Sequence, residues 1–125
     1  MTAPFSVEVV RVYDDWQAHP GVHVFVDRLW PRGLSKDRFR PDEWLKDIAP
    51  SNELRKWYHA DIEPRWPEFR RRYRAELDGN AGAMAHLLDL ARKGPVALLT
   101  STHDIDRSAT VILRDVILER LEAAT

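Results

Sequence analysis

Two short runs in which almost every residue is apolar constrain the fold of this chain more than any other feature. Residues 22–27 hold Val22, Val24, Phe25 and Val26, and residues 96–100 form a second run of the same kind. A strand with apolar side chains on both faces is typical of a sheet that is covered on both sides. We therefore predict two buried strands. Because helical patterns separate them along the chain, they should be parallel and joined by a right-handed crossover.

The rest of the chain supplies one more strand and several helices. Residues 7–13 are rich in valine and predict a strand, whereas residues 29–40 predict a loop. Apolar side chains recur at helical spacing in five further segments. These predicted helices are residues 41–48, 51–59 with Ser51 as N-cap, 64–77, 81–93, and 106–122 with Asp104 or Asp106 as cap. The pattern predicts an α/β fold, a small and mostly parallel sheet flanked by helices on both faces, in a single domain over residues 1–125.

Composition excludes several kinds of chemistry. The 125 residues include no cysteine, so disulfides, thiolate catalysis and cysteine-bound zinc are impossible. We predict no metal and no cofactor. The formal net charge of −1 gives no bulk attraction to nucleic acid. The sequence shows neither a signal peptide nor a run long enough to span a membrane, so we expect a cytoplasmic protein with no membrane partner. It does not fix the oligomeric state.

Polar and aromatic side chains follow both buried strands, at the edge of the sheet where ligands of α/β proteins bind. The candidates are Asp27, Arg28, Trp30 and Arg32 after the first strand, and Ser101, Thr102 and His103 after the second. Arginines and hydroxyls suit phosphate or carboxylate, and the last helix begins nearby. Asp27 and His103 are candidate catalytic acid and base groups, and Trp30 is a candidate stacking platform. Arg55, four residues before His59, is a further candidate for the same pocket.

Each of these residues also has a structural interpretation. Asp27 and Arg28 would then form an ion pair, and Trp30 would belong to the core. Ser101 and Thr102 would satisfy backbone groups in a turn. Arg55 and His59 would lie on a solvated helix face.

Two other functions stay open. Arg70, Arg71, Arg72 and Arg74 lie on one predicted helix and suggest a nucleic-acid-associated module, but interleaved glutamates favour a solvated face, so we consider nucleic acid an unlikely partner. The five tryptophans suggest instead a non-catalytic protein-interaction domain, with Trp16, Trp30 and Trp57 as candidate interface residues.

Several segments, taken in order, are similar to one known family. They are residues 11–14, 26–33, 42–51, 53–56, 69–73 and 96–99, of which 26–33 (Val-Asp-Arg-Leu-Trp-Pro-Arg-Gly) is the most specific. Together they resemble the YeaO-like branch of the bacterial "domain of unknown function 488" family. The resemblance implies a small cytoplasmic α/β domain with no established reaction. Longer relatives often carry cysteine motifs where this chain has Thr100 and Ser101, so no thiol role carries over to it.

The leading functional hypothesis is a site for a small anionic, phosphate-bearing ligand at the carboxyl ends of the strands. Arg28, Trp30, Arg32, Arg55, Ser101 and Thr102 would bind the ligand. Hydrolase or transferase chemistry by Asp27 and His103 is the catalytic version of this hypothesis.

Overall fold

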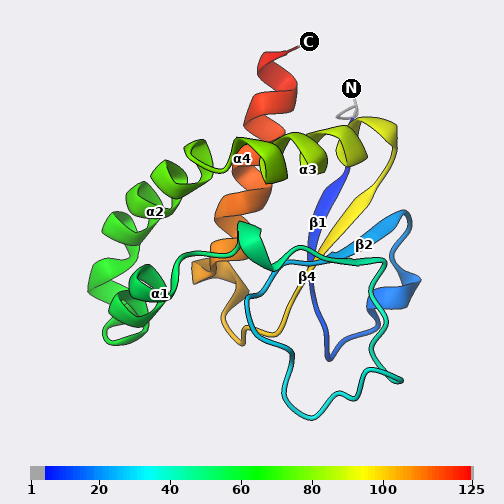
Figure 1. Ribbon diagram of the computed structural model, residues 1–125, viewed down its shortest axis with the longest axis horizontal. Coiled ribbons are helices and arrows are strands. Elements are labelled where there is room, and N and C mark those ends of the chain that lie inside the picture. The colour runs from blue at the N-terminus through cyan, green and yellow to red at the C-terminus, as the bar shows by residue number, and fades with distance from the viewer. Residues whose placement is uncertain (1–4, 125) are drawn as a thin grey trace.

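A four-stranded parallel sheet forms the centre of the computed structural model, which describes residues 5–124 (Figure 1). The strands are β1 (Val7–Arg11), β2 (Val22–Phe25), β3 (Glu43–Trp44) and β4 (Val96–Thr100), in the order β1-β4-β2-β3. All three pairings are parallel. The predicted α/β class is confirmed, and so is the parallel pairing of β2 with β4.

Strand β4 is the central element of the sheet. It pairs with β1 from Val7 opposite Val96 to Arg11 opposite Thr100, and with β2 from Val22 opposite Val96 to Phe25 opposite Leu99. All five of its residues are buried. This burial on both faces explains the continuous apolar run, because neither set of alternating side chains faces water.

Strand β2 begins at a close approach to the chain before β4. Gly21 has a φ of +89°, and a Cβ atom there would lie 1.9 Å from the carbonyl oxygen of Pro95. The next residue, Val22, donates its N–H to that same oxygen. Glycine is therefore required at position 21 both by backbone conformation and by space.

Four helices follow the predicted patterns closely. They are α1 (Asn52–His59), α2 (Ile62–Asp78), α3 (Ala81–Lys93) and α4 (Ala109–Ala123). Ser51 caps α1 by accepting a hydrogen bond from the N–H of Leu54, as expected. Helix α4 begins later than predicted. A 3₁₀ turn, Ile105–Arg107, precedes it, and its cap is Ser108 rather than Asp104 or Asp106.

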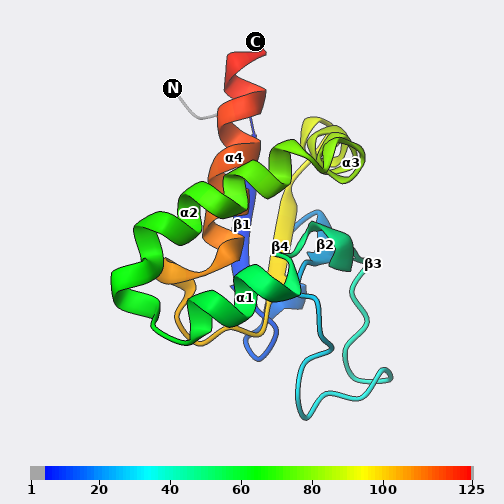
Figure 2. The same ribbon diagram turned by 60° about the vertical axis from the view of Figure 1, so that its left-hand side comes forward.

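The two faces of the sheet are covered in different ways, as Figures 1 and 2 show. The buried apolar side chains of all four helices pack in one cluster with Val7, Val24, Val26, Val96 and Leu98. The other face is covered by the coil between β2 and β3 and by the 3₁₀ turn Trp16–Ala18. Its cluster comprises Val10, Val12, Trp16, Phe25, Phe39, Ala97 and Leu99, with Trp30, Leu34 and Trp44 packed against it. The expectation of helices on both faces is therefore wrong.

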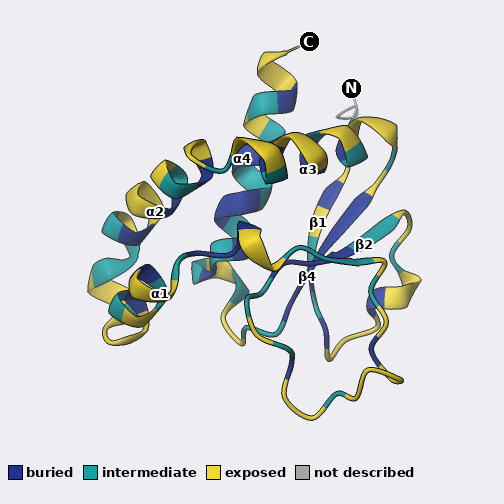
Figure 3. Cartoon of the chain, viewed as in Figure 1, coloured by how far each residue is buried: buried dark blue, intermediate teal, exposed yellow. Residues whose placement is uncertain are grey.

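Aromatic rings give the coil-covered face its order. The ring centroid of Phe39 lies 5.2 Å from that of Phe25, 5.2 Å from that of Trp30 and 5.3 Å from that of Trp16. Such edge-to-face and tilted contacts fix the rings relative to one another. The coil itself is largely exposed on its outer side (Figure 3).

The helix predicted over residues 41–48 is absent. This segment holds β3, which pairs with β2, and the 3₁₀ turn Lys46–Ile48. Trp44, which falls at helical spacing with Leu45 and Ile48, instead donates its indole N–H to the carbonyl of Asp27 and packs against the coil-covered face. None of the helices within residues 5–124 has the length and apolar character needed to cross a bilayer.

Candidate functional site

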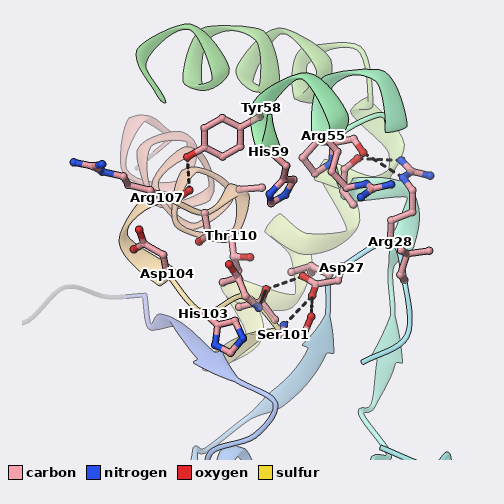
Figure 4. Close-up of a pocket in the computed structure, with 18 of the residues that line it drawn as sticks. Asp27, Arg28, Arg55, Tyr58, His59, Ser101, His103, Asp104, Arg107 and Thr110 are labelled. Atoms are coloured by element: carbon pink, nitrogen blue, oxygen red, sulfur yellow. Dashed lines mark hydrogen bonds between the residues drawn. The ribbon is translucent and has the colours of Figure 1, made fainter. Parts of the chain in front are cut away.

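A pocket of about 500 Å³ opens at the carboxyl ends of β2 and β4, beneath α1 (Figure 4). Its lining includes all eight residues that the sequence predicted for a site. These are Asp27, Arg28, Trp30, Arg32, Arg55, Ser101, Thr102 and His103. Pockets of this size commonly hold small molecules. The structure thus brings the predicted residues together, while their functional roles stay predictions.

Asp27 joins the ends of the two strands. One carboxylate oxygen accepts a hydrogen bond from the Thr100 hydroxyl at 2.7 Å. The other accepts from the backbone N–H and the hydroxyl of Ser101, both at 2.8 Å. The hydroxyl protons of Thr100 and Ser101 are therefore directed at Asp27, and neither is available to donate to a ligand.

Arg28 does not pair with Asp27, so the predicted ion pair is wrong. Its guanidinium donates to the carbonyls of Pro50 and Ala49, both at 3.2 Å. These bonds tie the segment after β2 to the start of α1. Ser51 is held in turn by Glu76, which accepts from its N–H at 2.8 Å and from its hydroxyl at 2.6 Å. Arg28 thus helps to fix the position of α1 relative to the strand ends.

Arg55 and His59 reach the pocket from α1, which makes α1 one of its walls (Figure 4). The Nε atom of Arg55 is buried and has no hydrogen-bond partner within the described structure. The guanidinium makes one long contact, 3.5 Å from an Nη to the side-chain oxygen of Asn52. Partial burial, and next the positive charge of Arg55, lower the pKa of His59. An uncompensated positive charge therefore faces the pocket on this side.

The amino end of α4 forms a third side of the pocket, through Ser108, Ala109 and Thr110. Ser108 satisfies the N–H of Val111, but the N–H groups of Ala109 and Thr110 precede the first intrahelical acceptor. Such groups and the helix dipole favour an anion. Asp104, also in the lining, opposes this effect.

Tyr58 holds the segment between β4 and α4 against α1. Its hydroxyl donates to the carbonyl of Arg107 at 2.6 Å. Burial and the charge of Asp104 raise the pKa of Tyr58 to about 12, against the opposing charge of Arg107. The phenol therefore remains protonated and stays a donor. A second bond, between the Arg107 guanidinium and Glu63 at 3.1 Å, ties the same segment to α2.

Three further candidates line the pocket at half-buried or exposed positions. Trp30 is half-buried, donates its indole N–H to the carbonyl of Leu34 and contacts the aromatic cluster, as its structural interpretation expected. Arg32 is exposed, and its carbonyl accepts from the Tyr13 hydroxyl at 2.8 Å. His103 is exposed and lies 3.5 Å from an Nη atom of Arg11.

Sequence reasoning missed several residues of the lining. Tyr13, Leu29, Tyr58, Arg107 and Thr110 all contribute to the pocket. Tyr58 falls at helical spacing with Leu54 in the predicted helix 51–59, and Thr110 lies in the first turn of α4. Nothing in their local spacing signals a pocket. Only the strand order, which sets β4 between β1 and β2, brings them together.

The arginine run on α2 carries its own counter-charges. Arg71 and Arg72 both pair with Glu68, and Arg74 pairs with Glu119 at 2.6 Å. The guanidinium of Arg72 also lies 4.4 Å from the ring centroid of Trp57. These contacts support the solvated-face interpretation. Among the described residues, no group of three or more His, Asp or Glu side chains is arranged to hold a metal ion.

Comparison with known proteins identifies the family. The family described as "Inactive DUF488-N3 subclade" matches residues 6–125. The chain is 43% identical over 117 residues to the uncharacterized protein Rv3073c of Mycobacterium tuberculosis. The matched residues make up 94% of this chain and 98% of that protein. It is 38% identical over 110 residues to the uncharacterized protein YeaO of Escherichia coli, which covers 88% of this chain and 95% of the relative. No solved structure shows significant similarity. The chain belongs to the DUF488 family, on its YeaO-like branch.

Proposed function

We propose that this protein binds a small, phosphate-bearing anion in the pocket between α1, the amino end of α4 and the carboxyl ends of β2 and β4. The observation that carries the proposal is the state of Arg55. A buried guanidinium N–H without a partner is unfavourable by about 1–3 kcal/mol, and an anion bound where Arg55 lines the pocket would offset this cost by pairing with the guanidinium. The lining has four arginines and two aspartates, which agrees with an anionic ligand.

The contacts within the pocket assign different tasks to the predicted residues. Arg55, the N–H groups of Ala109 and Thr110, and the hydroxyl of Thr102 would contact the anion. Ser101 would contribute only as an acceptor, because its proton is directed at Asp27. Arg28 would position α1, and Arg32 would attract the ligand from the pocket mouth.

Binding without covalent chemistry is the version that we favour. Both carboxylate oxygens of Asp27 already accept hydrogen bonds from Thr100 and Ser101, which leaves fewer of their lone pairs free to contact a ligand. The chain has no cysteine to act as nucleophile, and the subclade that its sequence matches is described as "inactive". Hydrolase or transferase chemistry by Asp27 and His103 stays the catalytic alternative. The proposal includes the cytoplasmic location expected from the sequence, because phosphate esters are abundant in the cytoplasm.

Calorimetric titration with inorganic phosphate tests the proposal, using two variants that each remove one positive charge from α1. Arg55→Gln should weaken phosphate binding about tenfold or more. Lys56→Gln is the matched control, because Lys56 is exposed and lies outside the pocket lining. It should leave the affinity within about twofold. Absence of phosphate binding to the parent, or equal loss in the two variants, would refute the proposal.

A further inference from the structure

The lining of the same pocket includes exposed apolar side chains that an inorganic anion would not use. Two large apolar side chains stand out as exposed among residues 5–124, Tyr13 at 44% and Leu29 at 62%. A single exposed apolar residue needs no explanation. Here both line one pocket, although one follows β1 and the other follows β2.

Tyr13 is held in a fixed orientation despite its exposure. Its hydroxyl donates to the carbonyl of Arg32 at 2.8 Å. The guanidinium of Arg11 lies 5.4 Å from its ring centroid, and the Nε atom of Arg11 donates to the carbonyl of Thr102 at 2.9 Å. The ring is therefore tied to the segments after β2 and after β4. A rigid aromatic surface loses little conformational entropy when a ligand stacks on it.

Leu29 is fixed through its neighbours. Arg28 donates to two carbonyls of the segment before α1, and Trp30 donates to the carbonyl of Leu34. The backbone on both sides of Leu29 is thus anchored while its own side chain stays exposed. The pocket lining therefore combines the cationic Arg55 with exposed apolar side chains that are held in place.

From this arrangement we infer that the ligand is an organic phosphate ester with a planar aromatic group, and that this group lies against Tyr13 and Leu29 while the phosphate faces Arg55 and the amino end of α4. The inference rests on the proposed anion site and specifies its ligand class. It assigns the stacking role to Tyr13, since the ring of Trp30 is already in contact with Phe25, Phe39 and Trp44.

Two matched pairs of probes test the inference by calorimetry. Phenyl phosphate is compared with inorganic phosphate, and adenosine 5′-monophosphate with ribose 5-phosphate. In each pair the first compound carries an aromatic ring that the second lacks. In at least one pair the aromatic compound should bind about tenfold tighter, as expected for stacking of one ring.

Variants then locate the aromatic group. Tyr13→Ala should abolish the advantage of the aromatic compound and leave the affinity for its ring-free partner unchanged. Leu29→Ser, at a more exposed position, should reduce the same advantage with little effect on the fold. Tyr13→Phe keeps the ring and should keep most of the advantage.

The outcomes separate this inference from the proposed function. If ring-free phosphates bind and the aromatic compounds bind no tighter, the inference is wrong while the anion site stands. If the aromatic advantage survives both Tyr13→Ala and Leu29→Ser in folded protein, the aromatic group does not lie against these two side chains. If none of the four compounds binds, both proposals fail.

Discussion

Two walls of the pocket differ in how completely their polar groups are satisfied. On the strand-end wall, the carboxylate of Asp27 accepts three hydrogen bonds from Thr100 and Ser101. On the α1 wall, Arg55 has a buried Nε atom without a partner, beside a histidine whose pKa is lowered. Buried polar groups that all have hydrogen-bond partners stabilise a fold. A buried charged group without partners destabilises it, and such a group is typical of functional sites. The comparison assigns a structural role to the strand-end wall, and it agrees with the proposal that the α1 wall contacts a ligand.

The largest expected effect is at the strand-end wall. Asp27→Asn replaces a carboxylate oxygen by an NH₂ group that cannot accept the bonds it receives now. We expect the free energy of unfolding to fall by about 3 kcal/mol, measured by urea denaturation. Asp37→Asn is the control, since that side chain is 93% exposed, and it should change stability by less than about 0.5 kcal/mol. If both variants were equally stable, the strand-end wall would not be a structural unit.

An intermediate loss is expected where the two walls are joined. Tyr58→Phe removes the hydroxyl that donates to the carbonyl of Arg107 and leaves the ring stacked on Phe69, at a centroid distance of 3.9 Å. The variant should lose about 1–2 kcal/mol of stability. Amide exchange should quicken between β4 and the first turn of α4. Unchanged exchange in this segment would show that the phenol does not hold it.

On the α1 wall, replacing the residue with the unsatisfied group should raise the stability of the fold. Arg55→Met keeps a long, flexible side chain and removes the unpartnered N–H. We expect stability to rise by about 1 kcal/mol in the absence of ligand, seen as a higher midpoint of thermal unfolding. Phosphate should stabilise the parent and not this variant. A loss of stability in Arg55→Met would mean that Arg55 is structural, which would remove the contrast between the walls.

The smallest effect concerns His59. Burial is the larger cause of the lowered pKa of His59, and the positive charge of Arg55 is the smaller one; Arg55→Gln removes that charge, so the pKa should rise part of the way toward its usual value. Phosphate bound to the parent should raise it too. Because the pKa is lower in the folded state than in the unfolded state, the contribution of His59 to stability is complete above about pH 6.5. It is lost as the pH falls through the folded pKa. Titration of the imidazole signals by NMR measures these shifts, and a fall in Arg55→Gln would contradict the assignment.

Much of the helix-covered side of the molecule could be predicted from local patterns. The bounds predicted for α3 and β4 agree with the structure. Apolar side chains at helical spacing followed by Gly94, and a short run of valine and leucine, are strong signals of a helix and of a buried strand. The cap at Ser51 was equally clear. Helix α4 was misplaced at its start, because Asp104 and Asp106 are good caps in isolation and a 3₁₀ turn places Ser108 at the cap instead.

The coil-covered side could not be predicted in the same way. Its order comes from contacts between rings far apart in sequence, such as Trp16 with Phe39, and such contacts leave no periodicity. The helical spacing of Trp44, Leu45 and Ile48 predicted a helix, but pairing with β2 made a short strand. The candidate site was found because parallel strands direct the residues that follow them to one edge. The partners of Asp27 and the exposure of Tyr13 required the tertiary structure.

The position of β4 in the sheet affects the order in which the chain can fold during its synthesis. The ribosome releases β1 and β2 first, yet both need β4 between them, and Val96 lies far along the chain from its partner Val7. In the described sheet β1 pairs with β4 alone, and before β4 emerges β2 can pair only with the two-residue β3. Pairing across such sequence separations is slow. Helix α4, which closes the pocket, emerges after β4. The pocket can thus form only after β4 and the first turns of α4 have been synthesised, and a ligand that fits it would stabilise chains of at least that length while leaving shorter precursors untouched.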